Sequence, residues 1–191
     1  MRVTGGNLRG RRLRSPQGGL RPTSDRVREA VFARLDDIDG CAVLDLYAGT
    51  GALGIEAVSR GATTAVFVER AVRCLSVLRA NVTALGSGAD TRVVADDAPR
   101  AVKRLARAGQ RFDLVFVDPP YASGETARAL EAIAGSDVLT DGAMVVVESG
   151  RRQPPVPVPG LAVLDERRYG DTLISRLVVA ETAATGGSEG G

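Results

Sequence analysis

Short apolar runs alternate along this chain with segments of helical periodicity, and this alternation constrains the fold more than any other feature. The intervals between the runs are long enough to hold helices, as in βαβ units. A parallel sheet built in this way is covered by helices on both faces. We therefore expect an α/β fold, with strands at Cys41–Leu46, Thr64–Glu69, Thr91–Ala95, Phe112–Asp118 and Ala143–Glu148.

Helical spacing fills the intervals. The first helix is expected from Ser24 to about Asp36, with Thr23 or Ser24 as its N-cap. Between the second and third strands, apolar residues recur at the period of an amphipathic helix. They are Val72, Leu75, Leu78, Val82 and Leu85.

The last part of the sheet should be antiparallel. Residues Arg151–Gly160 hold four of the nine prolines, so this segment is expected to be a linker. Leu161–Tyr169 and Thr172–Ala180 follow as two strands, and Gly170-Asp171 between them suits a tight hairpin turn. The sequence thus predicts seven strands, mostly parallel, with an antiparallel final hairpin.

The length of 191 residues fits one domain with a small appendage. We expect a basic arm at 1–20, a domain at 21–180 and a disordered tail at 181–191, which has four glycines and no large apolar residue. No signal peptide or membrane-length apolar run is present, so a cytoplasmic protein is expected. Cys41 and Cys74 lie in apolar segments, as reduced core residues do.

The composition excludes several chemistries. The chain has no histidine, which rules out Ser-His-Asp and Cys-His catalysis and histidine metal sites, and no metal is expected. Its net charge of +2 hides an asymmetry: residues 1–34 carry nine arginines against two acidic residues, a net +7, so the remainder carries −5.

Clustered positive charge is typical of a nucleic-acid contact. The candidate RNA-binding residues are Arg9, Arg11, Arg12, Arg14 and Arg21. Arg2–Thr4 and Arg12–Arg14, on either side of Gly5-Gly6-Asn7, can form a small hairpin. A floppy, solvated basic tail is the alternative.

A glycine-rich loop follows the first expected strand. The segment from Asp45 through Tyr47, Gly49 and Gly51 has glycines where the backbone must turn sharply and approach a ligand. Glu69, 20 residues beyond Gly49, ends the second strand, where a carboxylate accepts hydrogen bonds from ribose hydroxyls.

Three acidic positions indicate which cofactor the loop binds. Asp96 and Asp97 end the third strand, where either can accept a hydrogen bond from an adenine amino group, although Asp there can also simply cap the next helix. A carboxylate at Asp45 would repel a pyrophosphate but suits the sulfonium and ammonium groups of S-adenosylmethionine. We therefore expect S-adenosylmethionine rather than a nicotinamide dinucleotide.

The motif after the fourth strand is Asp118-Pro119-Pro120-Tyr121. A carboxylate and a backbone carbonyl held by a rigid proline turn can accept both hydrogens of an exocyclic NH2 group, while a tyrosine ring stacks on the base that carries it. The motif therefore indicates a site for a nucleobase amine, with a plain turn as the alternative.

The chain resembles the class I, Rossmann-like S-adenosylmethionine-dependent methyltransferases that carry Asp, Asn or Ser followed by Pro-Pro and an aromatic residue. Segments Arg2–Gly6, Arg9–Leu13, Arg21–Phe32 and Leu44–Gly51 are similar to the bacterial RsmD family. This resemblance implies methylation of the N2 amine of one guanine in 16S ribosomal RNA. It further implies a monomer acting on an assembled or assembling small subunit.

Rival functions stay open at this point. Adenine N6 in DNA would satisfy the motif equally well, but no gap between the expected elements could house a target-recognition insert. Methylation of a protein or small-molecule amine leaves the basic arm without a purpose. A non-catalytic RNA-binding module and an NAD-dependent oxidoreductase are the remaining alternatives, and Asp45 disfavours the second.

Overall fold

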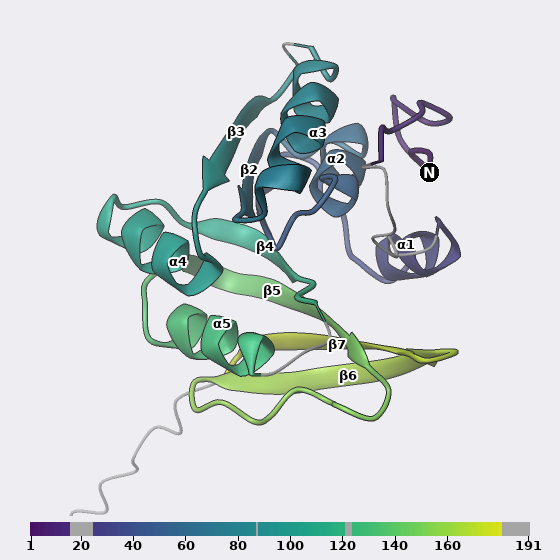
Figure 1. Cartoon of the computed structure of the whole chain (residues 1–191). Coiled ribbons are helices and arrows are strands. Elements are labelled where there is room, and N and C mark those ends of the chain that lie inside the picture. The colour runs from purple at the N-terminus through teal and green to yellow at the C-terminus, as the bar shows by residue number, and fades with distance from the viewer. Residues whose placement is uncertain (16–24, 87, 121–123, 181–191) are drawn as a thin grey trace, which may run out of the picture.

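A seven-stranded sheet in the order β3-β2-β1-β4-β5-β7-β6 forms the centre of the molecule (Figure 1). The computed structural model describes residues 1–15, 25–86, 88–120 and 124–180. The strands are β1 (Ala42–Leu46), β2 (Thr64–Glu69), β3 (Asp90–Ala95), β4 (Phe112–Val117), β5 (Leu139–Gly150), β6 (Leu161–Tyr169) and β7 (Thr172–Val179). The helices are α1 (Asp25–Phe32), α2 (Ala52–Ser59), α3 (Val72–Thr83), α4 (Ala98–Arg107) and α5 (Glu125–Ala134).

The first five strands are parallel, and β7 pairs antiparallel with both β5 and β6. The predicted mixed sheet with an antiparallel final hairpin is therefore confirmed. The chain runs outward from β1 to β3 and then returns to place β4 on the other side of β1. This reversal leaves a crevice beyond the carboxyl ends of β1 and β4, where open α/β sheets bind ligands.

Helices cover both faces of the sheet. Helices α4 and α5 pack on one face, where Leu44, Val115 and Val147 belong to the first apolar core. Helices α1, α2 and α3 pack on the other, over Phe67 and Phe116. Because both faces are covered, the central strands are apolar at nearly every position instead of alternating.

Helix α1 is shorter than predicted. It ends at Phe32, whereas the periodicity had suggested about Asp36. Asp36, Asp37 and Asp39 follow, and negative charge is unfavourable at a helix C-terminus, where the last carbonyls concentrate negative partial charge. The helix therefore stops before the acidic segment.

Strand β5 is longer than predicted. It begins at Leu139, and the pairing with β4 shifts register between Phe112 and Leu114. Gly142 has φ 76°, a left-handed conformation that suits a bulge. The Thr140-Asp141-Gly142 triplet is typical of a turn, so its sequence concealed the start of the strand.

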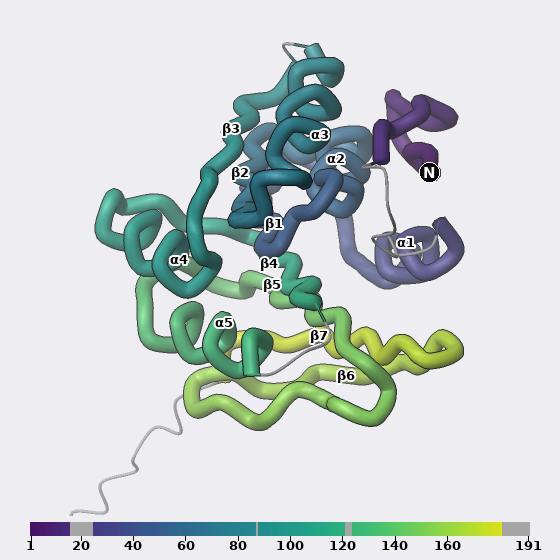
Figure 2. Tube along the Cα trace, in the orientation of Figure 1, coloured from purple at the N-terminus to yellow at the C-terminus, as the bar shows by residue number. Residues whose placement is uncertain are grey.

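The first fifteen residues form a compact segment, called the arm here, that lies beside α2 and α1 (Figure 2). An antiparallel bridge joins Arg2 to Arg12, and the Val3 amide donates to the Arg11 carbonyl at 3.0 Å. Val3 and Leu13 are buried in the core beneath α1 and α2. Most of the side chains between them face solvent.

Some predictions fall on residues outside the described part of the chain. They concern Arg21 and Tyr121, the N-cap of α1 at Thr23 or Ser24, and the tail at 181–191. Within the described residues, none of the helices is long and apolar enough to cross a bilayer.

Candidate active site

The carboxyl ends of β1 and β4 bring the glycine-rich loop and the Asp-Pro-Pro motif together. Leu46 pairs with Val117, so the residues that follow each strand lie next to one another. The Asp118 amide points to the Leu46 carbonyl at 3.5 Å. The predicted cofactor and amine sites therefore share one edge of the sheet.

The loop after β1 has a backbone that few side chains would allow. Tyr47, Gly49 and Gly51 have φ values of 60°, 56° and 83°. A Cβ atom on Gly51 would lie 2.7 Å from Leu78 Cδ1, so only glycine fits between the loop and α3. The tight turn directs the loop backbone toward the crevice and starts α2 directly afterwards.

Asp45 lies beneath this loop and is 1% exposed. Its Oδ2 accepts a hydrogen bond from the Gly54 amide at 2.9 Å, in the first turn of α2. Burial raises the pKa of Asp45 to about 7, the Gly54 hydrogen bond partly opposes this, and the nearby Glu69 charge adds to it. A positively charged group bound in the crevice would stabilise the ionised carboxylate of Asp45.

Glu69 ties the ends of β1 and β2 together. One carboxylate oxygen accepts from the Gly49 amide at 2.8 Å and the other from the Ala71 amide at 2.6 Å. The side chain, which is 8% exposed, therefore fixes the middle of the glycine-rich loop. Glu69 thus ends the second strand, 20 residues beyond Gly49, as the sequence indicated.

Asp96 and Asp97 follow β3 and differ in their surroundings. Asp96 is buried and paired with Arg100 at 2.6 Å and Arg104 at 2.9 Å. Burial alone would raise the pKa of Asp96, but the hydrogen bond from Arg100 and the two positive charges outweigh it and lower the pKa. Asp97 is more exposed and lies 3.4 Å from an Arg70 nitrogen, so its carboxylate is the more accessible of the two.

Tyr47 bridges the glycine-rich loop to α5. Its hydroxyl lies 3.1 Å from Glu125 Oε2 and 3.2 Å from the Glu125 carbonyl. Burial, followed by the negative charge of Glu125, raises the pKa of Tyr47. The phenol therefore stays protonated and can donate to Glu125.

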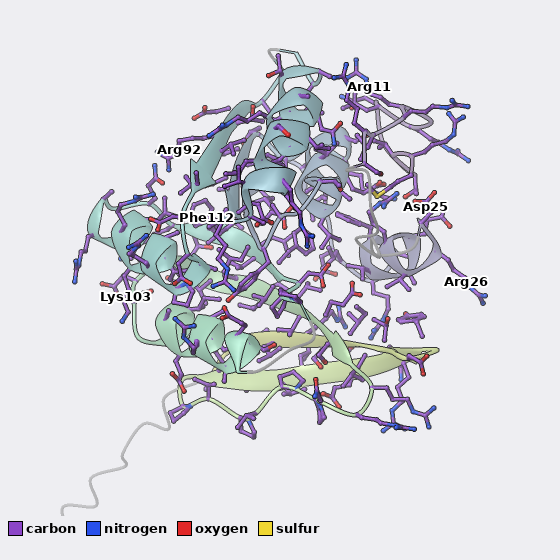
Figure 3. The ribbon with its side chains drawn as sticks, in the orientation of Figure 1. Arg11, Asp25, Arg26, Arg92, Lys103 and Phe112 are labelled. Atoms are coloured by element: carbon purple, nitrogen blue, oxygen red, sulfur yellow. The ribbon has the colours of Figure 1, made fainter. Side chains whose placement is uncertain are left out.

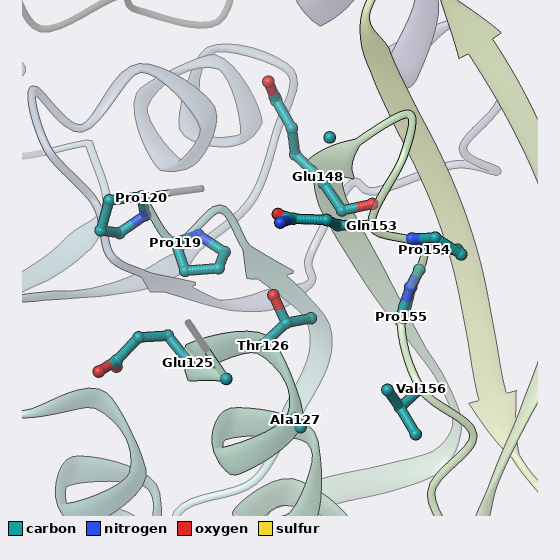
Figure 4. Close-up of a pocket in the computed structure, with 13 residues that line it drawn as sticks. Pro119, Pro120, Glu125, Thr126, Ala127, Glu148, Gln153, Pro154, Pro155 and Val156 are labelled. Carbon is teal, nitrogen blue, oxygen red and sulfur yellow. The ribbon is translucent and has the colours of Figure 1, made fainter. Parts of the chain in front are cut away.

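A pocket of about 330 Å³ opens beside the Asp-Pro-Pro motif (Figure 4). Pro119 and Pro120 form one wall. The other walls come from the start of α5, the end of β5 and the proline-rich linker, with Glu125, Thr126, Glu148, Ser149, Gln153 and Pro154 among the lining residues. Its volume is of the size that holds a small ligand or a single base.

Sequence motifs did not identify Glu148, Ser149 and Gln153 as site residues. They follow no recognisable pattern, and only their place at the end of β5 and in the adjoining linker brings them into the pocket. The available signal was positional, because the carboxyl ends of parallel strands meet at one edge.

The arm packs on α2 and α3 rather than on β4 and β5. Its predicted RNA-binding residues Arg9, Arg11, Arg12 and Arg14 are all exposed. Figure 3 shows Arg11 and Arg26 at one end of the molecule, and Arg92 and Lys103 at the other. The arm therefore presents its charge to solvent on one side of the fold.

Glu56 of α2 holds the arm in place. Its carboxylate accepts from the Thr4 amide at 2.8 Å, the Thr4 hydroxyl at 2.8 Å and the Gly5 amide at 2.7 Å. The same side chain pairs with Arg28 at 3.2 Å and Arg60 at 2.9 Å. Burial would raise the pKa of Glu56, but the Thr4 hydrogen bonds and the two guanidinium groups lower it.

Arg28 shows that the basic residues near the N-terminus do not share one role. It is fully buried, donates to the Arg2 carbonyl and pairs with Asp25 at 3.0 Å as well as with Glu56. A guanidinium in this position stabilises the junction between arm, α1 and α2 and is inaccessible to RNA.

Asn81 connects the arm to the glycine-rich loop. Its Oδ1 accepts from the Arg14 amide at 2.9 Å, and its Nδ2 donates to the carbonyls of Arg14 at 3.1 Å and Thr50 at 2.9 Å. The side chain is 4% exposed, so these bonds are shielded from water. The end of the arm and the predicted cofactor loop thus share one amide group.

The strand order and the acidic glycine-rich loop at the β1–β4 reversal define the class I methyltransferase fold. Within this class, the family model described as "Conserved hypothetical protein 95" matches residues 1–177. The chain belongs to this family, and the expected relationship to the RsmD proteins is confirmed.

Relatives in this family match along most of their length. Ribosomal RNA small subunit methyltransferase D of Escherichia coli K12 is 40% identical over 183 residues, covering 95% of this chain and 90% of that protein. The Haemophilus influenzae protein of the same name is 30% identical over 172 residues, 89% of each chain.

Solved structures agree with the fold. Escherichia coli yhhF superposes with a TM-score of 0.79 at 34% identity, covering 93% of this chain and 96% of that chain. A more distant structure, the methyltransferase SMU.776 complexed with SAH, has a TM-score of 0.61 at 16% identity and shares the fold. The match covers 80% of this chain and 48% of that one.

Proposed function

We propose that this protein transfers a methyl group from S-adenosylmethionine to the N2 amine of a guanine in 16S ribosomal RNA. The observation that carries the proposal is the junction of β1 and β4, where the acidic glycine-rich loop adjoins Asp118 and a base-sized pocket walled by Pro119 and Pro120. The relatives named as ribosomal RNA small subunit methyltransferase D support ribosomal RNA as the substrate class.

The residues at the crevice fit the proposed cofactor. Gly49 and Gly51 leave the loop without a Cβ atom at these two positions, and Glu69 lies at the end of β2, where ribose hydroxyls can donate to a carboxylate. The buried Asp45 carboxyl suits a positively charged ligand. Asp97 is the better placed partner for an adenine amino group, since Asp96 is buried and closely paired with two arginines, whereas Asp97 is more exposed and its ion pairs are longer, at 3.4 and 3.9 Å.

The amine site works by alignment. S-adenosylmethionine, when bound, supplies a methyl group on a positively charged sulfur. The Asp118 carboxylate and the Pro119 carbonyl accept the two N–H bonds of the guanine amine, which exposes the nitrogen lone pair. Asp118 also lies where it can take the proton that the nitrogen loses, directly or through water. Tyr121, which lies outside the described residues, is the proposed stacking partner.

The test of this function is the identity of the product. Labelled S-adenosylmethionine is supplied with naked 16S RNA, assembled small subunits or duplex DNA, and the products are digested to nucleosides. We expect label in N2-methylguanosine from one of the RNA substrates. Label in N6-methyladenosine, or none in N2-methylguanosine, would contradict the proposal.

Replacing Asp118 should separate chemistry from cofactor binding. Asp118→Ala removes the acceptor that orients the amine, so turnover should fall by about a thousandfold or more, while cofactor affinity stays within a few fold. Turnover is measured by methyl transfer and affinity by calorimetry. The matched control is Asp137→Ala, an exposed carboxylate just before β5 at the opposite edge of the sheet, which should keep wild-type turnover. A large loss of cofactor affinity in Asp118→Ala would place Asp118 in the cofactor site instead.

A further inference from the structure

The pocket beside the Asp-Pro-Pro motif contains polar groups that the amine chemistry does not use. Glu148 and Ser149 line it from the end of β5, and Gln153 lines it from the adjoining linker. Figure 4 shows the Gln153 amide directed toward Pro119. The pocket therefore offers hydrogen-bonding groups to a base beyond its amine.

Strand register places Glu148 next to Asp118. Val117 of β4 pairs with Val147 of β5, and the two carboxylates each follow one residue later. Neighbouring strands lie about 4.8 Å apart, and side chains alternate between faces. Val117 and Val147 both belong to the core beneath α4 and α5, so Asp118 and Glu148 both start toward the opposite face. The two side chains therefore start toward the same face at the carboxyl ends of adjacent strands, and Glu148 is 7% exposed.

A second carboxylate distinguishes guanine from adenine on chemical grounds. In guanine, two ring nitrogens flank the carbon that carries the exocyclic amine: N1, which carries a hydrogen, and N3, which carries a lone pair. In adenine, N1 is the one ring nitrogen beside the amine, and it carries a lone pair. An ionised carboxylate can only accept hydrogen bonds, so it pairs with guanine N1–H and repels adenine N1.

Ser149 is an independent sign that a ligand completes this pocket. It is 5% exposed, and its Oγ is buried with no hydrogen-bond partner in the described part of the chain. Leaving such a hydroxyl unpaired is unfavourable. An acceptor atom of a bound nucleotide would supply the missing partner.

We propose that Glu148 determines the choice of base by accepting guanine N1–H while Asp118 holds the neighbouring N2 amine, and that the Ser149 hydroxyl, which starts toward the opposite face of β5, donates to an acceptor atom of the same nucleotide. This inference rests on the proposed function, because it assigns roles within the same site. It gives the choice of guanine a basis in this chain's own residues.

The first test needs no variant. The methylated guanine is located in the wild-type product and is then replaced by 2-aminopurine in a ligated 16S RNA. This base keeps the 2-amino group, but its N1 is an acceptor and it has no O6. We expect kcat/KM to fall by roughly a hundredfold or more with 2-aminopurine. Glu148 would lose its charge-assisted hydrogen bond from N1–H, and the lone pair on N1 would be repelled by the carboxylate. Equal methylation of guanine and 2-aminopurine would overturn the inference.

The second test assigns the discrimination to Glu148. In Glu148→Gln the amide can turn either its oxygen or its NH2 toward N1, so the preference for guanine over 2-aminopurine should fall at least tenfold. The four combinations of enzyme and base form a cycle that isolates the pairing of Glu148 with N1–H. A guanine preference equal to that of wild type would contradict the assignment. The matched control is Glu131→Gln, an exposed glutamate on α5, which should keep the full preference.

Ser149→Ala separates a ligand role from a structural one. Because Oγ has no partner within the described fold, its removal should leave the melting temperature unchanged or raise it, while kcat/KM for guanine falls roughly tenfold. A lower melting temperature with unchanged kcat/KM would show that Ser149 is structural.

Failure of the inference and failure of the proposed function are distinguishable. If the wild-type protein makes no N2-methylguanosine from any RNA, the proposed function is wrong and the inference falls with it. If it does make N2-methylguanosine, two results would each show that only the inference is wrong. One is that 2-aminopurine is methylated as well as guanine, and the other is that Glu148→Gln keeps the wild-type preference for guanine. Cofactor affinity within a few fold of wild type shows that Glu148→Gln is folded.

Discussion

The ionised form of the buried Asp45 carboxyl group is one that a positively charged ligand would stabilise. Its pKa of about 7 lies well above the ordinary 3.8 because the side chain is buried. As the pH rises, Asp45 therefore ionises at a lower pH in the unfolded chain than in the folded protein. This ionisation stabilises the unfolded state relative to the folded state. Asp45 contributes most to stability below about pH 4, and this contribution is lost as the pH rises toward 7.

Replacing Asp45 with asparagine should remove this pH dependence in the unliganded protein. The rise in pKa from 3.8 to about 7 corresponds to roughly 4 kcal/mol. Asp45→Asn should therefore melt at about the wild-type temperature near pH 4.5 and roughly 10 °C higher at pH 8. Melting temperatures measured across this pH range in both proteins check the prediction.

Two comparisons sharpen the Asp45 experiment. Asp141→Asn, which replaces an exposed carboxylate on β5, is the matched control and is measured over the same pH range. Added S-adenosylmethionine should raise the wild-type melting temperature more at pH 8 than at pH 6, because the ionised carboxyl attracts a cation. The same increment in Asp45→Asn at both pH values, together with wild-type-like affinity, would mean that Asp45 does not face the cofactor.

At the scale of secondary-structure elements, helix α2 connects the glycine-rich loop to the arm. Its N-terminus follows the glycine-rich loop, and its C-terminal half binds the arm through Glu56 and Ser59. The Asn7 amide donates to the Ser59 carbonyl at 2.7 Å, and the Leu8 amide donates to Ser59 Oγ at 2.9 Å. The arm is thus fixed to the same helix that begins at the predicted cofactor site.

Truncating Glu56 should destabilise the fold and release the arm. Glu56→Ala leaves the buried Arg28 paired with the half-exposed Asp25 but without its buried partner, and breaking a buried ion pair typically costs about 3–5 kcal/mol. Urea denaturation should show the loss, and limited proteolysis should cut within residues 1–15 at a concentration of protease that spares the wild-type arm. Glu29→Ala, on the exposed side of α1, should change neither measurement. Wild-type stability in Glu56→Ala would show that the buried pair contributes little.

The positions of the strands were largely predictable from sequence. Their irregularities, and the side chains that strand pairing brings together, were not. Apolar runs identified β1, β2 and β4 to within one residue at each end, because buried parallel strands need continuous apolar sequence. The bounds of β3, a largely exposed edge strand, were predicted equally closely. The early start of β5 was missed because a bulge at Gly142 has the composition of a turn.

The residues of the candidate site fall into a group that the sequence predicted and a group that it did not. Asp45, Gly49 and Glu69 occupy local loop positions with recognisable spacing, and they meet at one edge of the sheet. Glu148 and Ser149 reach the pocket through pairing of β4 with β5, which joins segments distant in the sequence. The pKa of Asp45 was equally out of reach, because it depends on burial by several elements.

The charge of the whole molecule is unevenly distributed, and this predicts how RNA binding responds to salt. Arg9, Arg11 and Arg12 are exposed on the arm. Replacing all three with glutamine should flatten the plot of log affinity against log salt by roughly 0.7–0.9 for each phosphate that the protein no longer neutralises. Binding of 16S RNA measured from about 50 to 200 mM salt checks this.

A control at the far side of the molecule tests the location of the RNA-binding surface. Lys103, Arg107 and Arg111 are also exposed, on or just beyond α4, and Figure 3 shows Lys103 at the end opposite Arg11. Their triple glutamine variant should keep the wild-type salt dependence. An equal flattening in both triple variants would show that RNA binding is spread over the surface rather than concentrated on the arm.

The hydrogen bonds that hold the arm to α2 and α3 come mostly from its main chain. Amides of Thr4, Gly5, Asn7, Leu8 and Arg14 make the bonds to α2 and α3, and the arginine side chains at 9, 11, 12 and 14 take no part in them. The attachment of the arm and its proposed contact with RNA therefore depend on different atoms, main-chain amides for the first and arginine side chains for the second. If the arm binds RNA as proposed, substitutions of these arginines should change the affinity while the scaffold beneath keeps its shape.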